Sequence, residues 1–177
     1  MRLRAAAARV AAVALFAALA AAPGHAQAPP GAKAAPPDSA AAAEERARVR
    51  ATIASHLGRP YVWGSSGPRS FDCSGFVWRV MQEDGILIKR TTARKYYLSL
   101  PRTSEGERWN FGNIVFFDNL KHCGIVATRD TFYHAAVTLG THATAFAPFW
   151  RPKISGVRAM PRPGAQRPPP PGRGPPP

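Results

Sequence analysis

The sequence predicts an α+β domain in which helices come first and closely spaced antiparallel strands follow. Between Cys73 and Gly85, large apolar residues recur at helical spacing: Phe76, Val77, Val80 and Met81. Further along, three short segments rich in strand-forming residues are separated by brief turns: 113–118, 122–127 and 131–137. The helix and the last two strand segments each contain a residue whose side chain can take part in catalysis: Cys73, His122 and His134.

The helix beginning at Cys73 has a start signal and a stop signal. Asp72 is a good N-cap, and Gly85 is a good residue to follow the last turn. Cys73 therefore lies in the first turn, where free N–H groups and the helix dipole favour an anion and hence a reactive thiolate. The alternative is a small buried hydrophobic residue, which is the usual state of a free cysteine.

A reactive thiolate needs a base, and His122 and His134 lie on neighbouring predicted strands. If the turn between these strands centres on Thr128, the two histidines are directly opposed with Cβ atoms about 5 Å apart. One imidazole then orients the other, which predicts a Cys-His-polar triad. His56 and His142 are expected to be non-catalytic, and His25 lies in the N-terminal leader.

The ordered motifs of this chain resemble those of the NlpC-type cell-wall cysteine peptidases. The similarity extends over roughly residues 44 to 159, and its motifs are GRPYVWG (58–64), FDCSGF (71–76), KRTTA (89–93), NIVFF (113–117), HCGIV (122–126) and FYHA (132–135). The resemblance implies a papain-like fold, with the nucleophile helix packed on a central antiparallel sheet. It also implies hydrolysis of peptidoglycan stem peptides.

Matched motif by motif, the resemblance assigns five site residues. Cys73 corresponds to the nucleophile, His122 to the base and His134 to the third polar residue. Tyr61 corresponds to the tyrosine near the nucleophile, where its hydroxyl could reach an oxyanion. Ser74 corresponds to the serine that lines the cleft.

Three further residues are candidates for substrate binding: Asp72, Arg90 and Trp63. Arg90 could hold a stem-peptide carboxylate in a bidentate pair, although an ordinary surface arginine is the alternative. Trp63, like the other tryptophans, is expected in the core or the cleft wall. Arg94 and Lys95 replace the glutamines common in the family, which leaves the substrate preference open. No metal or other cofactor is expected, because no Cys/His cluster has zinc-ligand spacing.

Cys123 is expected to be a free, packed residue without a disulfide to Cys73. It follows His122 directly on a strand, so its side chain should point to the opposite face and away from the nucleophile.

Composition divides the chain into four parts. Residues 1–26 have the pattern of a signal peptide, residues 27–43 form an Ala/Pro-rich linker, residues 44–160 form the peptidase domain, and residues 161–177 form a basic Pro-rich tail. A retained membrane anchor is the alternative for the first segment. We therefore expect an exported monomer of the periplasm or cell envelope, with no membrane span after cleavage. Within the domain, further helices are expected from Glu44 to Gly58 and over 91–100, and further strands over 141–146 and 154–159.

The formal net charge of +14 favours anionic partners. Six basic residues and no acidic ones follow Trp150: Arg151, Lys153, Arg158, Arg162, Arg167 and Arg173. The export signal and the lack of a nucleic-acid-binding motif argue against nucleic acid. The anionic cell envelope is the expected target of the tail, and a purely solubilising tail is the alternative.

These observations predict an exported cysteine peptidase that cuts stem peptides through an acyl-enzyme. The resemblance implies that the bond is either γ-D-glutamyl-diaminopimelate or a diaminopimelate cross-link, and the sequence does not decide between them. The alternatives are an amidase or acyl transferase, an exported cell-wall toxin with the same triad, or a weakly catalytic wall-binding module.

Overall fold

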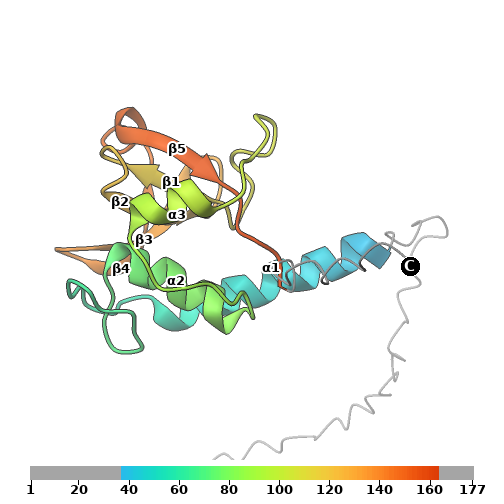
Figure 1. The fold of residues 1–177 in the computed structure, drawn as a ribbon, viewed down its shortest axis with the longest axis horizontal. Coiled ribbons are helices and arrows are strands. Elements are labelled where there is room, and N and C mark those ends of the chain that lie inside the picture. Colours follow the sequence, from blue (N-terminus) through green and yellow to red (C-terminus); the bar gives the residue numbers. More distant parts are fainter. Residues whose placement is uncertain (1–36, 164–177) are drawn as a thin grey trace, which may run out of the picture. The chain divides into compact units, whose positions relative to one another are not determined.

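A computed structural model describes residues 37–163 of the chain (Figure 1). In this range the α-helices are α1 (Pro37–His56), α2 (Cys73–Glu83) and α3 (Ala93–Ser99). The strands are β1 (Ile114–Phe117), β2 (His122–Val126), β3 (Thr131–Ala136), β4 (Gly140–Ala145) and β5 (Ile154–Arg158), and a short 3-10 turn over Arg151–Lys153 leads into β5. The predicted α+β class is confirmed.

The first helix begins earlier than the sequence predicted. It starts at Pro37 rather than near Glu44, so residues 37–43 are helical and not part of a linker. A run of four alanines, residues 40–43, explains the difference, because alanine has the highest helix propensity. Val49 and Ile53 anchor the helix in the core, whereas Leu57, expected on the same stripe, is 38% exposed.

The nucleophile helix α2 has the predicted caps. The Asp72 carboxylate accepts a hydrogen bond from the Gly75 N–H, and Gly85 follows the helix with a left-handed φ of +79°. Phe76, Val77, Val80 and Met81 are fully buried.

The sheet has the order β4-β3-β2-β1-β5, and all its neighbouring strands are antiparallel. β2 pairs with β3 through Ile125–Tyr133 and Val126–Phe132, so the turn centres on Arg129 and not on Thr128. His122 is therefore displaced diagonally from His134 by two residues instead of lying opposite it. A displacement of two residues keeps both side chains on one face of the sheet.

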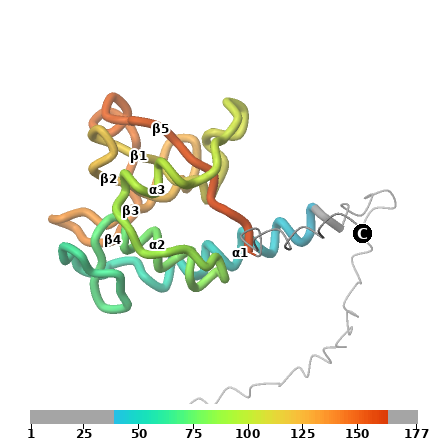
Figure 2. Tube along the Cα trace, viewed as in Figure 1, coloured from blue at the N-terminus to red at the C-terminus, as the bar shows by residue number. Residues whose placement is uncertain are grey.

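The two faces of the sheet support separate clusters of buried residues. On one face, α2 contacts β2 and β3, and Tyr97 of α3 packs on Phe116 of β1 with ring centroids 5.2 Å apart (Figures 1 and 2). The other face is aromatic, with Phe117, Phe132 and Phe146 at its centre. The site described below lies where elements of both faces meet.

Several predictions concern residues outside the described range. The signal peptide (1–26), most of the linker (27–36) and the tail from residue 164 onward are in this group. Among helices within residues 37–163, none combines the length and apolarity needed to cross a bilayer.

Candidate active site

Cys73 occupies the first turn of α2 and is 7% exposed. The loop that precedes it is held close to the helix: the Asp72 N–H donates to the Ser65 carbonyl at 2.9 Å. A Cβ atom on Gly75 would lie 2.0 Å from that same carbonyl oxygen. Only glycine permits this close approach. The motif around the nucleophile therefore supplies the cysteine and also the glycine that lets the loop pack against the helix.

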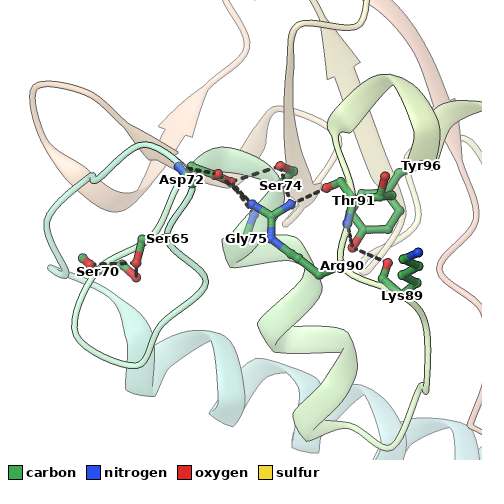
Figure 3. A network of polar contacts seen from close by, with 10 residues as sticks. Ser65, Ser70, Asp72, Ser74, Gly75, Lys89, Arg90, Thr91 and Tyr96 are labelled. Atoms are coloured by element: carbon green, nitrogen blue, oxygen red, sulfur yellow. Dashed lines mark hydrogen bonds and ion pairs between the residues drawn. The ribbon is translucent and has the colours of Figure 1, made fainter.

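The Asp72 carboxylate, at the N-cap of α2, is the centre of a hydrogen-bond network (Figure 3). Its Oδ1 accepts from the Gly75 N–H at 2.6 Å and from the Ser74 hydroxyl at 3.0 Å, and its Oδ2 accepts from the Gly64 N–H at 2.9 Å. Arg90 Nη2 completes the network at 2.8 and 2.6 Å from the two oxygens. Asp72 and Ser74, both candidates for substrate contact, are thus largely committed to internal bonds.

The position of Arg90 corrects one prediction from the sequence. Its Nη2 pairs with Asp72, and its Nη1 donates to the Ser74 hydroxyl at 3.0 Å and to the Thr91 carbonyl. This guanidinium is therefore neither an ordinary surface group nor free to grip a substrate carboxylate, since a bidentate grip would require it to release Asp72.

The surroundings of Cys73 favour its ionised form. Its pKa is lowered to about 5, first by a hydrogen bond from Cys123 and then by a hydrogen bond and the charge of His122, against the opposing effect of burial. At neutral pH the group is a thiolate. The negative charge of Asp72 opposes this only weakly, and Arg90 offsets that charge.

His122 and His134 form the predicted histidine pair. His122 begins β2, His134 lies in β3, and their Nε2 and Nδ1 atoms are 2.8 Å apart. Because Nε2 of His122 faces His134, its Nδ1 is left for Cys73. A Cβ atom on Gly124 would come within 2.5 Å of the Tyr133 carbonyl and 3.1 Å of the His134 Cβ, so glycine allows β2 to approach β3 at this point.

His134 is held neutral. Burial, with the neighbouring His122 and His142 acting in the same direction, lowers its pKa from 6.5 to about 3. A neutral imidazole has one acceptor nitrogen, and a protonated His122 requires that acceptor at His134 Nδ1. The His134 proton then lies on Nε2, which is buried without a hydrogen-bond partner.

Aromatic rings surround both imidazoles. Trp150 stacks on His122 with centroids 5.2 Å apart and lies edge-on to His134 at the same distance, and Phe132 lies 4.7 Å from His134. Sequence reasoning had placed Trp150 only in the core or cleft wall. Nothing in the linear spacing connects residue 150 with residue 122, because the contact depends on the path of the chain between β4 and the 3-10 turn, where the Trp150 N–H donates to the Phe146 carbonyl.

Tyr61 lies near the nucleophile, as its motif predicted. It forms a short bridge with Phe71, immediately before the N-cap. Burial raises the pKa of its hydroxyl, with a smaller contribution from the charge of Cys73. The hydroxyl therefore stays protonated and can donate a hydrogen bond to an anion.

Trp63 is neither core nor buried wall, contrary to expectation. Its side chain is 86% exposed on the loop between Tyr61 and the nucleophile, next to Val62, which is 50% exposed. The other tryptophans are at least partly covered: Trp78, Trp109 and Trp150. An exposed tryptophan close to the site remains available for contact with a ligand.

Cys123 also departs from the expectation. Its side chain does point to the opposite face from His122, but that face carries α2, so Cys123 belongs to the same buried cluster as Cys73. Both cysteines are free thiols. Within residues 37–163, no three His, Cys, Asp or Glu side chains are arranged to hold a metal ion.

Residues 58–159 match the model of the NlpC/P60 family. The matched range includes Cys73, His122 and His134. The chain belongs to the NlpC/P60 family. This confirms the predicted resemblance, and the papain-like α+β fold agrees with the solved structures of this family described below.

Similar curated proteins are named as endopeptidases. The probable endopeptidase p60 of Listeria seeligeri is 42% identical over 78 residues, which are 42% of this chain and 14% of p60. The probable peptidoglycan endopeptidase LytE of Bacillus subtilis is 29% identical over 106 residues, or 58% of this chain and 30% of LytE. The chain thus spans less than a third of the length of either relative.

Solved structures of NlpC/P60 proteins have the same fold. A Staphylococcus aureus protein described as similar to a lipoprotein of the NLP/P60 family is 27% identical, with a TM-score of 0.58 over 66% of this chain and 41% of that one. The peptidoglycan hydrolase RipB of Mycobacterium tuberculosis gives a TM-score of 0.56 at 21% identity, over 76% of this chain and 72% of that one. Because RipB is only 21% identical to this chain, its similarity shows a shared fold and nothing more.

Proposed function

We propose that this protein is an exported cysteine peptidase that hydrolyses the stem peptides of peptidoglycan. The observation that carries the proposal is the Cys73 thiolate beside His122, whose other ring nitrogen lies 2.8 Å from a neutral His134. A nucleophile, a base and an orienting group are the components of a cysteine peptidase. The family's peptidoglycan endopeptidases supply the substrate class.

In the proposed reaction, the Cys73 thiolate attacks a stem-peptide carbonyl and forms a C–S bond. The negative charge passes to the carbonyl oxygen, where the backbone N–H of Cys73 and the Tyr61 hydroxyl stabilise it. Collapse of this intermediate breaks the C–N bond, and His122 gives its proton to the leaving amine. Water, deprotonated by His122, then hydrolyses the thioester and regenerates the thiolate.

The orienting role proposed for His134 follows from its neutrality. Its Nδ1 accepts the Nε2–H of His122, which directs the second nitrogen of His122 toward Cys73. Because the pKa of His134 is about 3, it does not compete with His122 for the catalytic proton above pH 4. Trp150, stacked on His122, limits rotation of that ring.

Digestion of purified sacculi tests this function. The full chain should release muropeptides whose masses identify the cleaved bond as γ-D-glutamyl-diaminopimelate or a cross-link, and Cys73→Ser should release none. Binding to sacculi without any release would instead favour a wall-binding module. Release from a non-peptide bond would favour an amidase.

We also propose that the basic tail from residue 161 promotes encounter with the anionic envelope. The described basic residues of β5 and the preceding turn have local partners: Arg151 pairs with Asp130, and Arg158 lies 3.7 Å over the Tyr97 ring. Lys153 lies 3.2 Å from the centroid of the Phe149 ring, and the other three basic residues after Trp150 follow residue 161: Arg162, Arg167 and Arg173. Truncation after Pro163 should weaken binding to sacculi at low salt only, because exposed charges are screened at higher ionic strength. Superimposable salt curves for the two forms would contradict this role.

A further inference from the structure

A groove of about 790 Å³ lies between the segment that follows α2, helix α3 and the end of the described chain. Most of its lining is apolar: Leu87, Ile88, Tyr96, Leu100, Met160 and Pro161. Leu100 and Pro161 are buried where they contribute to it. Cys73, His122 and His134 do not line it, so the groove is separate from the candidate active site.

Hydrogen bonds hold the segment over residues 86–91, which forms one wall of the groove. The Ile88 carbonyl accepts from Trp78 Nε1 at 3.0 Å and from Gln82 Nε2 at 3.1 Å, and both donors belong to α2. The Tyr96 hydroxyl donates to the Lys89 carbonyl at 3.2 Å, which joins the same segment to α3. The groove is therefore formed before any ligand arrives, and binding to it avoids the cost of ordering its walls.

Positive charge surrounds this apolar lining. Three exposed cations contribute to the groove: Lys89, Lys95 and Arg162. None of the described residues that line it is acidic, and within residues 37–163 none of the three cations is in an ion pair with a carboxylate. Charges of one sign around a depression concentrate ligands of the opposite sign. The groove thus suits a ligand that has an apolar body and an anionic group.

The size of the groove indicates a small molecule. Sites for small ligands have volumes of about 300–1,000 Å³ and a mainly apolar lining with a few polar groups. The basic tail of the chain is a poor occupant, because residues 164–177 contain two arginines and no acidic residue. Its charge would repel the cations of the groove.

We propose that the groove binds a single-chain anionic amphiphile. Its aliphatic chain packs along Leu87 and Met160, and its carboxylate or phosphate group contacts the three cations. This site is additional to the proposed peptidase function and does not depend on it.

The groove adjoins the segment that supplies Arg90 to the network around Asp72. Lys89 and Thr91 both line it, and they flank Arg90 in the chain. Figure 3 shows the Arg90 side chain directed toward Asp72, with Lys89 on the other side of it. The ligand therefore contacts both neighbours of Arg90 without reaching the nucleophile, and its binding is measured without peptidoglycan.

NMR of the full chain with 13C-labelled methionine methyl groups tests the proposal. Met160 lines the groove, whereas Met81 is fully buried in the core, and Met160→Leu assigns the first signal. Dodecanoate, kept below its micelle concentration, should shift the Met160 signal to saturation and leave the Met81 signal nearly unchanged. Decanoate should bind about tenfold more weakly, because two fewer methylene groups are buried.

The head group is tested with ligands that share one aliphatic chain. Dodecyl phosphate and dodecanoate should both bind, and the tighter of the two identifies the preferred anion. Uncharged dodecyl maltoside should bind about tenfold more weakly than either at low salt, where exposed charges are screened least. Equal binding of the maltoside would overturn the anionic character of the ligand.

Two exposed leucines provide a matched pair of variants. Leu87 is 77% exposed and lines the groove, whereas Leu98 is 71% exposed on α3 and does not. Leu87→Asp should weaken dodecanoate binding at least about tenfold, because it removes an apolar contact and repels the anion. Leu98→Asp should leave the affinity within about twofold, since it changes the net charge equally at another position. Equal affinities of the two variants, or a Met160 signal that does not respond in the wild type, would overturn the proposal.

Three further outcomes would also contradict it. Dodecanoate should raise the melting temperature of the wild-type chain, and a fall would indicate general denaturation instead of binding to the folded state. Truncation after Gln166 should leave the Met160 signal unchanged without ligand, and a shift would mean that the tail occupies the groove. Saturation by an acidic peptide rich in leucine, but not by dodecanoate, would indicate a protein partner.

Discussion

Around Cys73 the fold places charges and hydrogen bonds, whereas around His122 and His134 it places aromatic rings. On the cysteine side, Asp72 is tied to three donors of its own segment and to Arg90. On the histidine side, Trp150 and Phe132 pack against the two imidazoles, whose facing nitrogens are 2.8 Å apart.

The two environments perform different tasks. Hydrogen bonds and a helix N-terminus stabilise a negative charge, which the cysteine requires before it can attack. Burial among aromatic rings penalises a positive charge, which keeps His134 neutral and able to accept a hydrogen bond from His122. A neutral imidazole can therefore serve as the third member of the triad in place of a carboxylate.

Replacing the nucleophile should have the largest effect on turnover. Cys73→Ser should lower kcat/KM for sacculus digestion at least about 1,000-fold, because the hydroxyl is not ionised at this site. The melting temperature should change little, since the Asp72 cap remains. His122→Ala should lose activity to a similar degree. A serine variant that releases muropeptides at a comparable rate would contradict the cysteine mechanism.

Breaking the network around Asp72 should have the largest effect on stability. Arg90→Ala leaves the 7% exposed Asp72 without its cation and should lower the free energy of unfolding by about 3 kcal/mol. The matched control is Arg151→Ala, which removes an exposed Arg–Asp pair and should change it by at most about 1 kcal/mol. Urea denaturation of both variants measures the difference, and equal losses would mean that the network is dispensable.

Removing the orienting imidazole should cost less than removing the nucleophile. His134→Ala should lower kcat/KM about 100-fold, and His134→Asn should restore much of this because its amide oxygen can accept the same hydrogen bond. His142→Ala is the control, since His142 packs on His134 without a hydrogen bond to His122. Equal losses for His122→Ala and His134→Ala would contradict the assignment of His122 as the base.

A further prediction concerns the pH dependence of stability. The pKa of His134 is lowered in the folded state from 6.5 to about 3, so the unfolded chain binds this proton more readily. The stability from the neutral ring is complete above pH 6.5 and is lost as the pH falls toward 3. In His134→Asn, the free energy of unfolding measured with urea should depend less on pH between pH 7 and pH 4. Parallel curves for the two proteins would show that His134 is not held neutral.

Much of this arrangement follows from local sequence. The strands lie within one or two residues of their predicted positions, because alternation and turn residues are local signals. The caps of α2 are equally local, and they place Cys73 in the first turn. The predicted face shared by His122 and His134 survives an error in the turn centre, because the register differs by an even number of residues.

The remaining features depend on contacts between distant segments. Arg90 reaches Asp72 across 18 residues, and no periodicity indicates that pair. The orientation of Cys123 was predicted correctly relative to His122, but its neighbour depends on which face α2 covers. The exposure of Trp63 likewise follows from the path of a loop, which its composition does not determine.

The central claim is that the fold makes Cys73 an anion before substrate arrives, and the pH dependence of its alkylation tests this most directly. Iodoacetamide modification of the wild-type chain, mapped to Cys73 by peptide mass, should rise to a plateau with a midpoint near pH 5. Below that pH the rate should fall about tenfold per pH unit as the thiolate is protonated. A midpoint near the ordinary thiol value of about 8.5 would contradict the account, because Cys73 would then be a buried thiol of the common kind.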